Sequence, residues 1–183
     1  MPRPQRIVVT VQREVAERLV AVPGDMSLLA VSVQFYGQPR IALRLGAGAF
    51  WPRPDVDSAV VRIDVYQRPP VDVPDEALFF RVVRAGFGQK RKQLRNAISA
   101  GLGLDKAAAD ALLRAAGIAP QRRAETLSLE EWAALARAVA RTAETTGLRS
   151  GLAAELPNSP GDVAPLRRAS RWTQSRPPVA DAV

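Results

Sequence analysis

The sequence contains no cysteine and no histidine. Without cysteine the chain can form neither a disulfide nor a thiolate metal site. Without histidine it lacks the side chain that most often acts as a general base at neutral pH, and with it the Ser-His and Cys-His dyads and the commonest metal ligand. Catalysis of those kinds is excluded, and we expect no bound metal.

Long apolar runs and a secretion signal are also missing. Hydrophobic residues make up 47% of the 183 residues, but no run approaches the roughly 20 residues that a membrane-spanning helix needs. The first six residues lack the apolar segment and the cleavage site of a secretory signal. The sequence therefore predicts a cytoplasmic protein with one core, or with one core and a small satellite domain.

Acidic side chains are outnumbered by basic ones, 18 to 26, which gives a formal net charge of +8. Residues 81–95 contain no acidic side chain at all, yet they include both lysines and arginines. Such an excess favours a polyanionic partner, either a nucleic acid or an anionic membrane surface. The membrane is the weaker alternative, because none of the expected helices has a basic face on one side and bulky aromatic residues on the other.

The spacing of apolar residues divides the chain near residue 70. Before it we expect strands at 7–11, 40–45 and 59–66 and a helix at 12–22, while residues 27–36 fit either a strand or a helix, of which we favour the helix. Residues 7–11 are β-branched and almost entirely apolar, which is typical of a buried strand in a parallel sheet. Such a strand needs neighbours on both sides, and this sequence offers few.

After the Arg68-Pro69-Pro70 segment only helical spacing is found. Asp105 can cap one helix, and Ser128–Glu131 is a capping box that begins the last one. The expected organisation is an α/β segment (1–70), an all-α segment (71–142) and a tail (143–183) whose five prolines and weak periodicity predict disorder.

Phe50-Trp51-Pro52-Arg53-Pro54, here called the aromatic-proline loop, connects two of the expected strands. Aromatic faces can stack on a nucleic-acid base, the prolines stiffen the backbone and remove donors, and Arg53 can attract a phosphate. The structural alternative is that Phe50 and Trp51 only cover the end of the sheet.

Four segments resemble, in the same order, motifs of the bacterial ribosomal RNA adenine dimethyltransferase family: Val11–Leu19, Phe50–Val61, Phe80–Asn96 and Arg122–Ser128. The resemblance covers roughly residues 6–141. It implies a Rossmann-like, S-adenosylmethionine-dependent methyltransferase domain followed by a small helical domain. It also implies N6,N6-dimethylation of adenosines in small-subunit (16S) ribosomal RNA, with that RNA or a 30S assembly intermediate as the partner.

The family's glycine-rich cofactor loop and its Asn-Leu-Pro-Tyr-type catalytic motif have no match in this sequence. The resemblance therefore implies only the C-terminal part of the Rossmann-like sheet plus the helical domain, with no catalytic or cofactor-binding residue in this chain. We expect the chain alone to be inactive and S-adenosylmethionine to be bound by an N-terminal half, for which a separately encoded chain is one candidate. The alternative is a noncatalytic rRNA-binding module of small-subunit assembly.

The candidate site residues follow from the loop and from the basic residues. Phe50 matches the family residue that stacks on the target adenosine, and we expect Trp51, Pro52 and Pro54 to assist it. Cations attract RNA phosphates regardless of sequence, and the candidates are Arg53, Arg84, Lys90, Arg91, Lys92, Arg95, Arg122 and Arg123. The run at 89–96 could instead be a solvated helix face.

Several of these positions have structural alternatives. Arg122 and Arg123 fit RNA contact and a structural role equally, since one of them can pair with Glu125. Asp55 and Asp57 resemble a paired-carboxylate site, but no other ligand type accompanies them, so we expect them to be structural.

Overall fold

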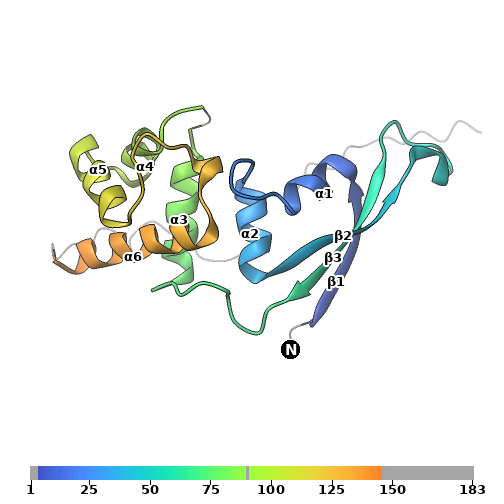
Figure 1. The fold of residues 1–183 in the computed structure, drawn as a ribbon, viewed down its shortest axis with the longest axis horizontal. Coiled ribbons are helices and arrows are strands. Elements are labelled where there is room, and N and C mark those ends of the chain that lie inside the picture. The colour runs from blue at the N-terminus through green and yellow to red at the C-terminus, as the bar shows by residue number, and fades with distance from the viewer. Residues whose placement is uncertain (1–3, 90, 146–183) are drawn as a thin grey trace, which may run out of the picture. The chain divides into compact units, whose positions relative to one another are not determined.

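The N-terminal part of the chain forms a three-stranded antiparallel sheet. The computed structural model describes residues 4–89 and 91–145. The strands of the sheet are β1 (Arg6–Gln12), β2 (Gly37–Leu45) and β3 (Ser58–Val65), and β3 lies in the middle (Figure 1). Val61 of β3 pairs with Val9 on one side and with Ile41 on the other. All three strands lie at or within a residue or two of their expected ranges, except that β2 begins three residues earlier.

The expectation of a buried strand in a parallel sheet at residues 7–11 is wrong. β1 is antiparallel to β3, it is an edge strand among the described residues, and its Val8 is 59% exposed. A β-branched apolar run suits any strand, whereas burial depends on the neighbours that the strand acquires. Here β1 has a described neighbour on one side only.

Helix α1 (Arg13–Leu19) covers one face of the sheet, and α2 (Leu28–Tyr36) follows it. Ala16 and Leu19 of α1 are buried with Ala59 and Val61 of β3 in one apolar cluster. The expectation of a helix at 27–36 is confirmed. Its start is fixed by a side-chain cap, because the Ser27 hydroxyl accepts a hydrogen bond from the Ala30 backbone N–H at 3.1 Å.

The described chain beyond β3 is helical: α3 (Glu76–Phe87), α4 (Leu94–Leu102), α5 (Lys106–Ala115) and α6 (Leu129–Thr145), which pack on one another (Figure 1). Side chains cap three of these helices, and the sequence predicts two of the caps, at Asp105 and at Ser128. Asp75 and Asp105 accept from backbone N–H groups at 2.7 Å, and Ser128 and Glu131 form the reciprocal capping box.

Glycine sets the distance between α3 and α4. A Cβ on Gly101 would lie 2.5 Å from the Ala85 Cβ and 2.6 Å from its Cα, so no larger residue fits without moving a helix. The described residues all belong to one compact unit, and the division expected near residue 70 stays a prediction. The tail predicted from residue 143 falls, beyond residue 145, outside the described residues.

The basic run does not continue as a helix. The helical spacing of the sequence includes residues 89–96, but α4 begins only at Leu94, and Arg91 and Lys92 lie in the connecting segment. Arg91 has a φ of 66°, a conformation rare for a residue with a side chain. Gly88 follows the last residue of α3 and weakens any continuation. Lys90 itself lies outside the described residues.

Candidate nucleic-acid interface

Asp57 fixes the base of the aromatic-proline loop. Its carboxylate accepts hydrogen bonds from the Ala47 backbone N–H at 3.1 Å and from the Arg13 guanidinium at 3.0 Å. Its carbonyl oxygen accepts from the Arg13 backbone N–H at 2.9 Å. The expected structural role of Asp57 is confirmed, and it ties the loop to the first residue of α1.

The aromatic side chains of the loop are exposed to solvent. Trp51 is 96% exposed and Phe50 is 36% exposed. Neither ring contacts another aromatic ring within residues 4–89 and 91–145. Arg53 is exposed beside them. Trp51 therefore covers no part of the described sheet, while Phe50 is partly shielded.

Four cations from separate segments line one cleft of about 480 Å³. We call it the cationic cleft: Arg18 comes from α1, Arg91 and Lys92 from the α3–α4 connection, and Arg123 from the segment before α6. Glu14 and Glu125 also line it, and Arg123 pairs with Glu125 at 3.7 Å. Arg18, Arg91 and Lys92 have no ion pair within the described parts of the chain, so their charges are available to an anion.

Sequence reasoning missed Arg18 as a member of this group. The available signal was its place near the end of the Val11–Leu19 motif, on the exposed side of α1. Its proximity to Arg91 and Arg123 depends on tertiary packing. Two backbone hydrogen bonds hold the walls together, since the Glu125 carbonyl accepts from Gly24 N–H at 2.9 Å and from Met26 N–H at 3.1 Å.

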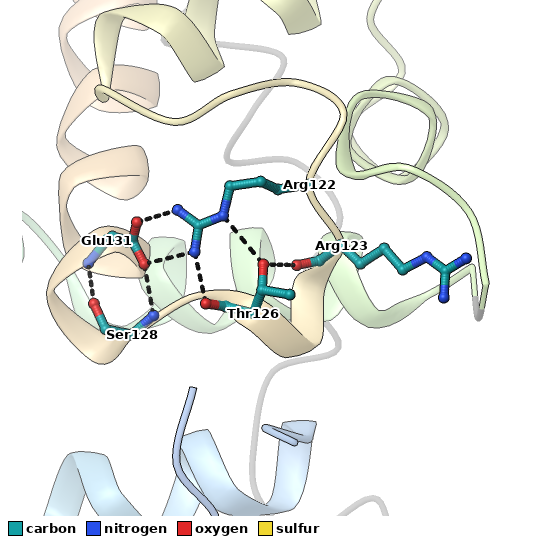
Figure 2. Close-up of polar contacts among 5 residues, drawn as sticks. All are labelled: Arg122, Arg123, Thr126, Ser128 and Glu131. Atoms are coloured by element: carbon teal, nitrogen blue, oxygen red, sulfur yellow. Dashed lines mark hydrogen bonds and ion pairs between the residues drawn. The ribbon is translucent and has the colours of Figure 1, made fainter. Parts of the chain in front are cut away.

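Arg122 and Arg123 point in different directions (Figure 2). The Arg122 guanidinium donates to both carboxylate oxygens of Glu131, to the Thr126 hydroxyl at 3.1 Å and to the Thr126 carbonyl at 2.6 Å. Arg123 extends away from this network, towards the α3–α4 connection. The pairing of one of them with Glu125 is confirmed, and it is Arg123 that pairs.

The Arg122–Glu131 pair also changes the acidity of the carboxyl group. The Arg122 hydrogen bond, opposed by partial burial and reinforced by the Ser128 backbone N–H, holds the pKa of Glu131 below its usual 4.5. The Arg122 carbonyl accepts from the Leu94 N–H at 2.7 Å, at the start of α4, where Gln93 gives no side-chain cap. Arg122 therefore joins α6 to the connection that carries Arg91 and Lys92.

The remaining candidates, Arg84 and Arg95, lie outside the cleft. Arg84 is exposed on α3 and lines a second concavity of about 440 Å³ with Gln89 and Gly101. Arg95 pairs with Asp110 of α5 at 3.4 Å. The lack of acidic residues in 81–95 argues against pairing within that segment, and the acid that pairs with Arg95 comes from another helix.

Helix α1 connects the loop and the cleft. Arg13 bonds to Asp57 at the loop, and Arg18 lines the cleft five residues later. At about 1.5 Å of rise per residue, these positions are about 7.5 Å apart along the helix. One helix therefore carries both the residue that anchors the loop and a residue that lines the cleft.

The described residues do not form a cradle for S-adenosylmethionine. No glycine stands between β1 and α1, α1 is seven residues long, and its N-cap residue Gln12 makes no side-chain capping bond. A nucleotide-like cofactor is usually held by a glycine-rich turn that brings backbone N–H groups to it. In the same residues, no group of three or more acidic side chains is placed to hold a metal ion. None of the described helices is long and apolar enough to cross a membrane.

The fold is similar to parts of two solved structures. It resembles the 23S rRNA methyltransferase ErmE, with a TM-score of 0.56 and 18% identity over 74% of this chain and 55% of that one. It also resembles a dimethyladenosine transferase from Plasmodium falciparum, with a TM-score of 0.59 and 19% identity over 78% of this chain and 58% of the other. Both neighbours have a Rossmann-like methyltransferase fold.

Residues 1–141 match the family described as ribosomal RNA adenine dimethylase, and the chain belongs to that family. The ribosomal RNA small subunit methyltransferase A of Dehalococcoides mccartyi is 52% identical over 130 residues, which are 71% of this chain and 45% of that protein. The protein of the same name from Moorella thermoacetica is 46% identical over 133 residues, 72% of this chain and 46% of the relative. The chain thus spans about half the length of these relatives.

Proposed function

We propose that this chain forms the RNA-binding side of an enzyme that dimethylates adenosines of small-subunit ribosomal RNA at N6, with S-adenosylmethionine as the methyl donor. The observation that carries the proposal is that α1 joins an exposed aromatic-proline loop to a cationic cleft. Family membership supplies the reaction. The cytoplasm, where ribosomes are assembled, is the proposed location.

The loop suits the handling of a target base. A base must leave its stack before its amine can be methylated, and flipped bases are held between aromatic or apolar side chains. We assign Phe50 to the target adenosine, with Pro52 and Pro54 limiting the motion of the loop. Arg53 stands next to the ring on which a nucleotide would lie and can attract its phosphate.

The cleft suits the RNA backbone. Arg18, Arg91, Lys92 and Arg123 are assigned to phosphates, and Arg84 extends the same surface along α3. Lys90 remains a candidate by its position in the sequence. Arg122 and Arg95 are assigned a positioning role, because their guanidinium groups bond to Glu131 and Asp110.

Methyl transfer is assigned to a complete enzyme in which a second, N-terminal half binds the cofactor. We therefore expect the 183-residue chain alone, incubated with labelled S-adenosylmethionine and unmethylated small-subunit RNA, to incorporate no label above a control without protein. Incorporation of label by this chain alone would contradict the assignment of cofactor binding to a second, N-terminal half. In an enzyme reconstituted with the N-terminal half of the Dehalococcoides relative, Phe50→Ala should lower turnover, and wild-type rates would return Phe50 to a structural role.

RNA binding by the chain should depend on salt through the cleft. Binding that neutralises several phosphates weakens steeply as salt rises, and each lost contact lowers the slope of log K against log salt by about 0.7–0.9. Arg18→Ala, Arg91→Ala and Lys92→Ala combined should flatten that slope by about 2–3. The matched control combines Arg68→Ala, Lys106→Ala and Arg114→Ala, exposed basic residues outside both the cleft and the loop. Equal effects of both sets would contradict the assignment.

A noncatalytic rRNA-binding module of small-subunit assembly is the alternative. The lack of a cofactor cradle in the described residues favours it. The reconstituted enzyme distinguishes the two functions. If the chain and the added N-terminal half together bind RNA but transfer no methyl group, the binding module is the better description.

A further inference from the structure

We propose that Trp51 stacks on a second base, adjacent to the target adenosine, so that the aromatic-proline loop holds two neighbouring unpaired nucleotides. This inference rests on the proposed function, and it concerns which nucleotides the loop recognises. Its starting point is the unequal exposure of two consecutive aromatic residues, 36% for Phe50 and 96% for Trp51.

The backbone separates the two rings. Phe50 has φ −122° and ψ 151°, which is extended backbone. In extended backbone, successive side chains point to opposite sides. The two rings also make no aromatic contact with each other, which favours two separate bases over one base clamped between them. Each ring offers its face to a different base, and adjacent nucleotides of a single strand are the ligand that supplies two bases at this spacing.

The surroundings of Trp51 favour a nucleic acid over a protein partner. The neighbouring Arg53 is exposed, and two further exposed arginines, Arg40 and Arg44, follow β2 towards the loop. Cations beside an aromatic platform are the usual arrangement for single-stranded nucleic acid, where every base can stack regardless of its identity. A protein partner would instead favour a continuous apolar patch around the ring, whereas exposed Arg53 and Asp55 interrupt the apolar surface that follows Phe50, Trp51 and Pro52.

The anchor at the base of the loop lowers the cost of ordering it. Asp57 holds Ala47 and Arg13, and the Ala49 N–H bonds to the Gly46 carbonyl at 3.0 Å. A platform that is fixed before binding loses less conformational entropy when a base stacks on it. The backbone at the base of the loop is thus held in place, while the exposed indole ring stays open to a base.

The test uses the full chain and short single-stranded RNA containing two adjacent adenosines, together with two strands in which one or the other adenosine is an abasic ribose. All three strands carry the same phosphates, so their electrostatic attraction is equal. On the intact strand, Trp51→Ala and Phe50→Ala should each weaken binding by about 5- to 150-fold, and the double variant by the product. Trp51→Phe should retain most of the affinity, and Val56→Ala, an exposed apolar residue of the same segment, should change little.

On each abasic strand, one of the two variants, Trp51→Ala or Phe50→Ala, should no longer weaken binding, because the base that its ring contacts is missing. The other variant should still weaken binding to that strand. Trp51 fluorescence, read in a Trp172→Phe background against the buried Trp132, should be quenched by the intact strand. If one abasic strand cancels both effects, the two rings share a base and the inference fails. If Trp51→Ala leaves affinity unchanged and the indole is not quenched while the chain still binds RNA, the inference fails and the proposed function stands. If the unaltered chain binds no RNA, both fail.

Discussion

At the scale of single residues, Arg122 shows how a basic side chain in a positive region can be structural. Its guanidinium bonds to Glu131 and Thr126, and its carbonyl oxygen accepts from Leu94 at the start of α4. Arg123, one position along, lines the cationic cleft. Two adjacent arginines therefore have separate roles, and the sequence alone treats them as equivalent.

Glu131→Gln should lower stability near neutral pH by about 1–2 kcal/mol, because it removes a charged acceptor from Arg122 while keeping the shape of the side chain. The folded-state pKa of Glu131 is lowered from 4.5, chiefly by the Arg122 hydrogen bond. The unfolded state therefore binds the proton more readily, so this contribution is present above about pH 4.5 and is lost as the pH falls through the folded pKa.

The measurement is urea unfolding of the full chain from pH 7 to pH 3. The difference in the free energy of unfolding between the wild type and Glu131→Gln should shrink as the pH falls below about 4.5. Glu130→Gln, one residue earlier and more exposed in its pair with Arg137, is the matched control and should change stability less. A wild-type advantage that is the same at pH 7 and pH 3 would contradict the assignment.

At the scale of helices and strands, the contact of α3 with α4 depends on a glycine. Gly101→Ala would place a methyl group 2.5 Å from the Ala85 Cβ and 2.6 Å from its Cα, and the backbone cannot rotate out of the way as a flexible side chain can. Overpacking of this kind costs about 1–3 kcal/mol. Thermal unfolding should show the loss, whereas Gly46→Ala, which meets nothing within 4 Å, should not. Equal melting temperatures for the two variants would mean that α3 and α4 can separate at little cost.

Elements that depend on local hydrogen bonds could be predicted from the sequence. The capping box at Ser128 and the cap at Asp105 act within three residues, so their helices began where expected. The edge position of β1 and the pairing of Arg95 with Asp110 could not, because both depend on residues far apart in the chain or on neighbours that it does not supply. The end of α3 before Arg91 does not follow from the apolar spacing, because a glycine such as Gly88 weakens a helix without requiring it to end.

The same division applies to the candidate site. The aromatic-proline loop was found because its residues are consecutive, and its anchor Asp57 is also nearby in sequence. The cationic cleft gathers residues from positions 18 to 123, and a linear reading found only the members that lie in a basic run or a motif. Arg18 was missed because its neighbours in space are about seventy or more residues away.

At the scale of the whole molecule, the two edges of the sheet are unequal. The outer edge of β2 carries Pro39, which has no N–H to donate, and an irregularity between Ile41 and Leu43. β1 has seven regular residues and neither of these features, and its Ile7 and Val8 are 39% and 59% exposed. Native proteins protect exposed edge strands with prolines, bulges or charges, because an unprotected edge can pair with another chain.

The isolated chain should therefore associate through β1 as its concentration rises. Val8→Lys should reduce this association, because a lysine on an edge strand places like charges opposite each other when two copies pair. The substitution should leave the melting temperature almost unchanged, since Val8 is more than half exposed. Val22→Lys makes the same change of charge at a residue that is 66% exposed and lies outside the strands, so it controls for net charge alone. Sedimentation velocity over a range of concentrations distinguishes them: if both variants reduce association equally, repulsion between whole molecules is responsible and the edge of β1 is not the contact.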